Sequence, residues 1–163
     1  MLGDPGVGKT SLIRRFVHDE FSDKYLSTIG AKVSEKDLNL KKDHDDVLFH
    51  LVIWDIAGQQ SFTSVAPSMF KGAQGALVIC DVTRKKTLDD LHNWIYNLTK
   101  TAGRVPFVIL VNKWDLTDRK AFELVDVERV AEGHESACLC TSAKTGHNVE
   151  SAFKKLGEFM LKV

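Results

Sequence analysis

The sequence predicts an α/β fold in which a mostly parallel sheet carries helices on both faces and ends in one antiparallel edge strand. Short apolar runs, rich in β-branched residues and bounded by turn residues, predict buried strands at 47–54, 75–80, 106–111 and 137–141. Between them, apolar residues recur at helical spacing, as in Leu88, Leu91, Ile95 and Leu98 and again within 149–160. Strands that alternate with helices are typical of a parallel sheet covered on both sides.

The remaining elements are predicted from weaker local signals. Residues 31–40 form a more polar run, which predicts an edge strand, and 41–46 predict its hairpin connection to the next strand. Thr87 and Asp90 have the residue types and spacing of a capping box, which predicts the start of a helix.

The composition indicates one globular domain spanning residues 1–163. Of the 163 residues, 44% are hydrophobic and 27% are charged, and the 22 basic and 22 acidic side chains cancel. A neutral chain lacks the cationic surplus that binding to nucleic acid requires, so we expect no nucleic-acid partner. The longest apolar runs have five residues, whereas a membrane-spanning helix needs about 20.

The cysteines, histidines and basic runs show no pattern typical of a disulfide, metal or membrane-binding site. The three cysteines predict reduced core thiols of a cytoplasmic protein, and the six scattered histidines show no spacing typical of a metal site. The basic runs at 41–42, 84–86 and 154–155 are predicted to be solvated surface, since a polybasic membrane site needs about four to eight clustered charges.

A phosphate-binding loop is predicted near the start of the chain. Residues 3–10 match the pattern G-x-x-x-x-G-K-[ST] as Gly3-Asp4-Pro5-Gly6-Val7-Gly8-Lys9-Thr10. Glycines let backbone N–H groups close on phosphate oxygens, and the following helix adds the positive end of its dipole. Lys9 is expected to reach the β- and γ-phosphates, and the Thr10 hydroxyl to bind Mg²⁺.

Two further strand ends carry residues suited to guanine. Asn112-Lys113-Trp114-Asp115 follows the strand at 106–111, and the Asp115 carboxylate can accept hydrogen bonds from guanine N1–H and N2–H. Adenine lacks these donors and would leave that carboxylate unpaired. Lys113 is expected to lie along the base and Asn112 to tether the loop. Thr141-Ser142-Ala143-Lys144 follows the last strand, where ligands of open α/β sheets bind.

The loops around residues 28 and 58 are predicted to handle Mg²⁺ and the γ-phosphate. Asp55 follows a buried strand and is suited to a water-mediated Mg²⁺ contact. Gly58 can offer its N–H to the γ-phosphate, and Gln59 is placed to orient the attacking water. Thr28 is expected to give Mg²⁺ a second hydroxyl.

Together these motifs resemble the Ras superfamily of small GTPases over nearly the whole chain, and most closely its Rab branch. The Rab-like segments are Ser27-Thr28-Ile29-Gly30, Ile53-Trp54-Asp55 and Phe70-Lys71-Gly72-Ala73. The resemblance implies the three-layer fold of phosphate-loop NTPases. It also implies that Lys9 and Gln59 act in catalysis and that Thr10, Thr28 and Asp55 bind the metal. The nucleotide-binding residues it implies are Asp4, Pro5, Gly6, Val7, Gly8, Lys9, Thr10, Ser11, Phe21, Tyr25, Thr28, Gly58, Asn112, Lys113, Asp115, Ser142, Ala143 and Lys144.

The function implied by the resemblance is a monomeric switch that binds GTP or GDP with Mg²⁺ and hydrolyses GTP slowly. Its implied partners are an activating protein, an exchange factor and effectors that contact the switch loops. Two alternatives remain open from the residues. The chain could hold GTP or GDP without hydrolysis, as a scaffold, or act as a small-molecule kinase, although no lid segment or second substrate site is recognisable.

Several positions depart from the family pattern. Pro5, which has no N–H, stands where Ras proteins commonly have glycine, and Gln60 replaces an acidic residue. Of the aromatic triad that Rab proteins present to effectors, Trp54 and Phe70 match, whereas Val33 replaces phenylalanine.

The two ends of the chain also differ from the family pattern. Only Met1 and Leu2 precede the phosphate loop, so we expect the first strand to be largely absent and the chain to be truncated at its N-terminus. No cysteine stands near the C-terminus for a prenyl anchor, so contact with membranes is expected only if a missing tail is lipidated.

Overall fold

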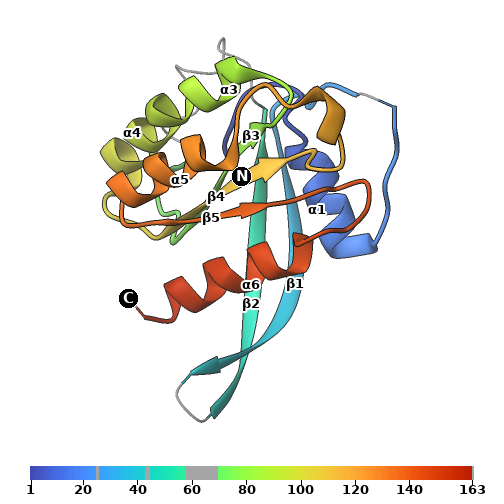
Figure 1. Ribbon diagram of the computed structural model, residues 1–163. Helices are drawn as coiled ribbons and strands as arrows, with labels where there is room; N and C mark the ends of the chain where they lie inside the picture. Colours follow the sequence, from blue (N-terminus) through green and yellow to red (C-terminus); the bar gives the residue numbers. More distant parts are fainter. Residues whose placement is uncertain (25, 43–44, 58–69, 163) are drawn as a thin grey trace.

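A computed structural model describes residues 1–24, 26–42, 45–57 and 70–162, and its elements follow the predicted order of strands and helices (Figure 1). All five predicted strands are present, with boundaries shifted by a few residues. The elements are α1 (Lys9–His18), β1 (Ala31–Lys42), β2 (Asp45–Ile56), β3 (Ala76–Asp81), α3 (Lys85–Asp89), α4 (Leu91–Ala102), β4 (Phe107–Asn112), a short 3₁₀ helix (Thr117–Arg119), α5 (Leu124–Gly133), β5 (Ala137–Cys140) and α6 (Val149–Met160).

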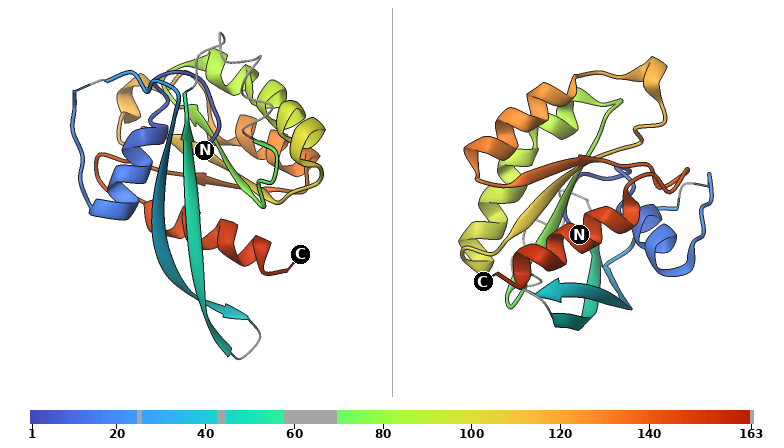
Figure 2. Two further views of the ribbon diagram at one scale, coloured as in Figure 1. Left: turned by 180° about the vertical axis from the view of Figure 1, so that it is seen from behind. Right: turned by 60° about the horizontal axis from the view of Figure 1, so that its bottom comes forward.

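The strands form two hydrogen-bonded sheets. β3, β4 and β5 pair in parallel in that order, and β1 pairs with β2 in antiparallel register from Ala31–Ile56 to Lys42–Asp45. The strands of the hairpin therefore extend through most of 41–46, which the sequence had assigned to the connection. In both Figure 1 and Figure 2, the hairpin projects well beyond the parallel sheet.

Met1 and Leu2 lie between the two sheets. Leu2 forms a parallel bridge with Val78, and its N–H donates to the Leu77 carbonyl over 2.8 Å. The amino group of Met1 donates to the carbonyl of Trp54 in β2 over 2.9 Å. A cavity of about 1,040 Å³ lies beside these residues, between β2 and β3. Among the described residues, no strand pairs with both β2 and β3, so these two strands belong to separate sheets.

Helices cover both faces of the parallel sheet, as predicted. Successive side chains of β3 point to opposite faces, so Val78 and Cys80 join a core under α4 and α5, while Leu77 and Ile79 join a second core. The second core is closed by α1, α6 and the hairpin, which lie on the other side of the sheet (Figure 2). No helix in the described part of the chain is long and apolar enough to span a bilayer.

Two aromatic rings hold α1 against α6. The rings of Phe16 and Phe153 are stacked with centroids 3.8 Å apart and an angle of 7° between their planes. Both side chains are buried, so truncation of either to alanine is expected to cost about 3–5 kcal/mol. Because α1 follows the phosphate loop, this contact fixes the base of the loop to the core.

The predicted capping box at Thr87 and Asp90 is wrong. α3 begins at Lys85, and Thr87 lies inside it, where its hydroxyl donates to the carbonyl of Arg84 over 2.7 Å. The same hydroxyl accepts the N–H of Asp81 over 2.9 Å. The hydroxyl is therefore engaged by the turn that joins β3 to α3 rather than by a helix cap.

The hairpin contains a cross-strand pair that we expect to titrate abnormally. His50 and Asp37 are register partners, and His50 Nδ1 is 2.6 Å from Asp37 Oδ1. The hydrogen bond with Asp37 raises the pKa of His50 above its ordinary value. Because the pKa is raised, the pair stabilises the hairpin below about pH 6.5, and this contribution is lost as the pH rises through the higher pKa.

An NMR titration of the His50 ring resonances tests this pair. We expect a midpoint above the ordinary histidine value, and Asp37→Asn should lower it. Glu35→Gln is the matched control, because Glu35 is 3.9 Å from His50 and should contribute less. Equal midpoints in the wild type and in Asp37→Asn would contradict the assignment.

Candidate functional site

Two glycines shape the phosphate loop of residues 3–8. Gly3 and Gly8 have φ values of 138° and 101°, which L side chains rarely adopt. A Cβ atom on Gly3 would lie 2.3 Å from the carbonyl oxygen of Ile79, and one on Gly8 would lie 2.2 Å from Nδ2 of Asn112. Both positions therefore require glycine for conformation and for space.

Lys9 is the cation at the centre of this loop. Its ammonium group donates to the carbonyls of Gly3 over 2.6 Å and Asp4 over 2.9 Å. Burial lowers the pKa of Lys9 to about 8, although Asp55 and Asp4 oppose the shift. Among the described residues, this ammonium is held by carbonyl oxygens alone, so it is suited to receive an anion.

The three predicted metal-binding residues converge in the structure. The hydroxyl of Thr10 is 2.8 Å from the hydroxyl of Thr28 and donates to Asp55 Oδ2 over 2.5 Å. The other carboxylate oxygen, Asp55 Oδ1, is buried and has no hydrogen-bond partner among the described residues. Two hydroxyls beside an unpartnered carboxylate oxygen fit a Mg²⁺ ion, which prefers oxygen ligands.

Asn112 joins the phosphate loop to the loop after β5. Its side-chain amide donates to the Val7 carbonyl over 2.8 Å. Its side-chain oxygen is 3.3 Å from the donors of Thr141 and Ala143. The predicted tethering contact of Asn112 is therefore present.

Asp115 is positioned by a residue whose contact the sequence did not predict. The Ser142 hydroxyl donates to Asp115 Oδ1 over 2.6 Å, and Ser142 itself is buried. The same hydroxyl accepts the N–H of Thr145 over 3.1 Å, which fixes its direction. Asp115 thus retains acceptor capacity for a ligand that carries two N–H donors.

Arg15 is a supporting residue that the motifs missed. It lies in α1, and its guanidinium group donates to the carbonyls of Ala143 and Lys144, each over 2.9 Å. No motif includes Arg15, because its partners lie 128 and 129 residues away in the sequence. The helix that follows the phosphate loop therefore also holds the third loop.

The predicted residues surround one cavity of about 330 Å³. One end is formed by the phosphate loop and the other by the loops after β4 and β5. The predicted nucleotide-binding residues that line it are Pro5, Gly6, Gly8, Lys9, Thr10, Ser11, Phe21, Thr28, Asn112, Lys113, Asp115, Ala143 and Lys144.

Other predicted residues lie outside the lining or outside the described part of the chain. Asp4 accepts a hydrogen bond from the Trp94 indole over 2.8 Å, and Val7 is fully buried in the core. Ser142 and Asp55 lie behind lining residues, as described above. Tyr25, Gly58 and Gln59 are not among the described residues.

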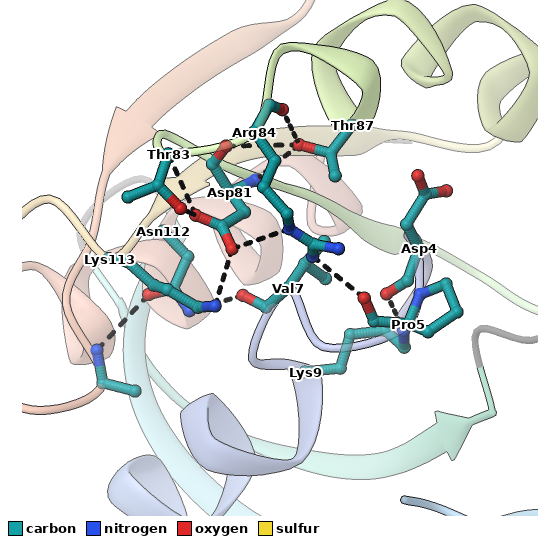
Figure 3. A network of polar contacts seen from close by, with 11 residues as sticks. Asp4, Pro5, Val7, Lys9, Asp81, Thr83, Arg84, Thr87, Asn112 and Lys113 are labelled. Atoms are coloured by element: carbon teal, nitrogen blue, oxygen red, sulfur yellow. Dashed lines mark hydrogen bonds and ion pairs between the residues drawn. The ribbon is translucent and has the colours of Figure 1, made fainter. Parts of the chain in front are cut away.

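A polar network at the end of β3 was not predicted from the sequence (Figure 3). Lys113 lines the cavity, and its ammonium group is 2.6 Å from Asp81 Oδ2. The same carboxylate oxygen accepts Arg84 Nε over 3.0 Å, and Arg84 Nη2 donates to the Pro5 carbonyl over 2.9 Å. The prediction that the basic run at 84–86 is only solvated surface is therefore wrong for Arg84.

The triad positions differ in exposure. Val33 and Trp54 are cross-strand partners on the hairpin and are 44% and 49% exposed. Phe70 is buried, at 2% exposure. In this structure, two of the three residues thus present apolar surface to solvent.

Comparison with known proteins assigns a family to this arrangement. The Ras family profile matches residues 1–162. Ras-related protein Rab-10 of Caenorhabditis elegans is 36% identical over 162 residues, covering 99% of this chain and 79% of the relative. Ras-related protein Rab-8B of Homo sapiens is 37% identical over 154 residues, covering 94% and 72%. Ras-related protein Rab-13 of Rattus norvegicus is 33% identical over 162 residues, covering 99% and 78%. The chain therefore belongs to the Ras family of small GTPases and lies in its Rab branch.

Proposed function

We propose that this protein is a guanine-nucleotide switch that binds GTP or GDP with Mg²⁺ and hydrolyses GTP slowly. The observation that carries the proposal is the convergence of the phosphate loop, Thr10, Thr28 and Asp115 on one cavity of about 330 Å³. A base at one end and phosphates at the other would satisfy groups that lack a full set of partners.

Guanine selectivity is proposed to come from Asp115. Its carboxylate accepts the N1–H and N2–H donors of guanine, while Ser142 holds it in place. An adenine ring offers an acceptor at N1 and no 2-amino group, so Asp115 would lose its partners. Leaving buried polar groups unpaired produces discrimination that a hydrophobic pocket cannot match.

Thr10, Thr28 and Asp55 are proposed to hold the Mg²⁺ ion. When bound, the ion neutralises charge on the phosphate oxygens. Thr28 lies in the loop before β1, so its hydroxyl can join or leave the site with the state of that loop. Hydrolysis would thereby release the first switch loop, as in other systems where a γ-phosphate orders a segment.

Water attack on the γ-phosphate is proposed to be oriented by Gln59, with Lys9 and loop N–H groups stabilising the developing charge. The motifs contain no arginine finger, so intrinsic turnover should be slow, on the order of 10⁻⁴ to 10⁻² s⁻¹. An activating protein would supply the missing acceleration. The protein would be a cytoplasmic monomer. The activating protein, an exchange factor and effectors would contact its switch loops.

A non-hydrolysing GTP- or GDP-binding scaffold is the second candidate. Pro5 and Gln60 favour it, because both depart from the family pattern beside the γ-phosphate and the attacking water. Proline removes one loop N–H that would otherwise stabilise charge.

Identifying the nucleotide that co-purifies with the native protein tests the two candidates. We expect stoichiometric GDP by chromatography of the extracted ligand, because a working switch hydrolyses bound GTP during isolation. Bound GTP would favour the scaffold. Well-folded protein that holds no guanine nucleotide, even after GDP is added, would contradict both.

Asp115→Asn should lower the affinity for GDP by at least about 100-fold, because two hydrogen bonds to a charged group are lost. The variant should gain preference for xanthosine diphosphate, whose 2-oxo group accepts from the new amide. Asp118→Asn is the matched control, since Asp118 lies in the neighbouring 3₁₀ helix and does not line the cavity. Unchanged GDP affinity of Asp115→Asn in a binding titration would refute the assignment.

Gln59→Leu should leave GTP affinity nearly intact and slow single-turnover hydrolysis by about 10- to 100-fold, the loss expected when the attacking water is misplaced. Gln60→Leu is the control at the adjacent position. If Gln59→Leu hydrolyses GTP at the wild-type rate, the water-orienting role does not belong to Gln59.

A further inference from the structure

Arg84 connects the phosphate loop to a buried carboxylate (Figure 3). Its Nη2 donates to the Pro5 carbonyl over 2.9 Å, and its Nε donates to Asp81 Oδ2 over 3.0 Å. The two contacts use different nitrogens of one planar guanidinium group, so they fix its position and its orientation together.

Asp81 gives Arg84 a rigid anchor. The side chain of Asp81 is 1% exposed, and Oδ1 accepts the N–H and the hydroxyl of Thr83 over 3.0 and 2.7 Å. Although burial opposes ionisation, hydrogen bonds from Lys113 and Thr83 lower the pKa of Asp81 below its ordinary value. The anchor is therefore a charged carboxylate whose direction is set before Arg84 binds it.

The Pro5 carbonyl determines where the next N–H points. A trans peptide unit is planar, so the carbonyl of Pro5 and the N–H of Gly6 point in opposite directions. Pro5 and Gly6 line the nucleotide cavity, whereas Arg84 does not. A carbonyl held outward by Arg84 thus turns the Gly6 N–H toward the cavity.

Pro5 itself makes this N–H more important. Proline has no N–H, so Gly6 is the first residue after Asp4 that can donate to a phosphate oxygen from this side of the loop. Gly6 has a φ of 72°, and a glycine can leave this conformation for others at little cost. The loop therefore needs an external contact to hold this peptide unit in one orientation.

We propose that Arg84 is a positioning residue that holds the Pro5–Gly6 peptide with its N–H facing the phosphates of the bound nucleotide. This inference rests on the proposed function, because it assigns a role within the same site.

Nucleotide release from three variants tests the role of Arg84. Arg84→Ala should release a fluorescent GDP analogue about tenfold faster than the wild type, because the loop loses a charge-assisted hydrogen bond. Arg84→Lys retains the positive charge but lacks the two separate nitrogens that make the two contacts, so it should also release the analogue faster than the wild type. Lys85→Ala is the control, since Lys85 is exposed and its nearest acidic partner is Asp89, at 3.9 Å. Wild-type release from Arg84→Ala or Arg84→Lys would overturn the proposal.

The choice of base separates positioning of the phosphate loop from a general defect of the site. Arg84→Ala should keep the preference for GDP over inosine diphosphate, because Arg84 contacts the phosphate loop and not the base site. Loss of that preference would overturn the positioning role.

The order parameter of the Gly6 N–H in ligand-free protein should fall from about 0.85 to below about 0.6 in Arg84→Ala and stay unchanged in Lys85→Ala. If the wild type binds no guanine nucleotide, the proposed function fails, and this order parameter alone decides the inference. An unchanged value would overturn it.

Discussion

The carboxamide of Asn112 is the contact on which the geometry of the site depends. One buried side chain donates to Val7 in the phosphate loop and accepts from Thr141 and Ala143 in the loop after β5. The space it occupies is the space that a side chain at Gly8 would need. The distance between the phosphate end and the base end of the cavity is therefore set by hydrogen bonds inside the protein, before any ligand binds.

The phosphate end of the cavity contains two groups of opposite charge that their described neighbours do not fully satisfy. Among the described residues, the buried ammonium of Lys9 donates to carbonyl oxygens alone, and Asp55 has a buried oxygen without a partner. An isolated anion would satisfy Lys9, and an isolated cation would satisfy Asp55. A phosphate bound together with a divalent cation satisfies both, so the two groups favour that combination over either ion alone.

Local patterns in the sequence predicted the layers, the five strands and most residues that line the cavity. These succeed because strand and helix periodicity and the spacing of the loop motifs are short-range properties. The contacts of Arg84 with Pro5 and of Arg15 with Ala143 join residues that are 79 and 128 positions apart. No spacing motif in the sequence predicts contacts of this length. Thr87 was assigned to a cap because its residue type and its spacing to Asp90 fit one, whereas its partners are Arg84 and Asp81, three and six residues earlier in the turn after β3.

Because β1 and β2 form a separate sheet, the hairpin is positioned mainly by side-chain packing. β1 and β2 each have 12 residues, span about 40 Å at the usual rise, and rest against α1 and α6 through side chains. Because Asp55 belongs to β2, the position of its carboxylate beside Thr10 depends on how the hairpin packs against these helices as well as on the phosphate loop itself.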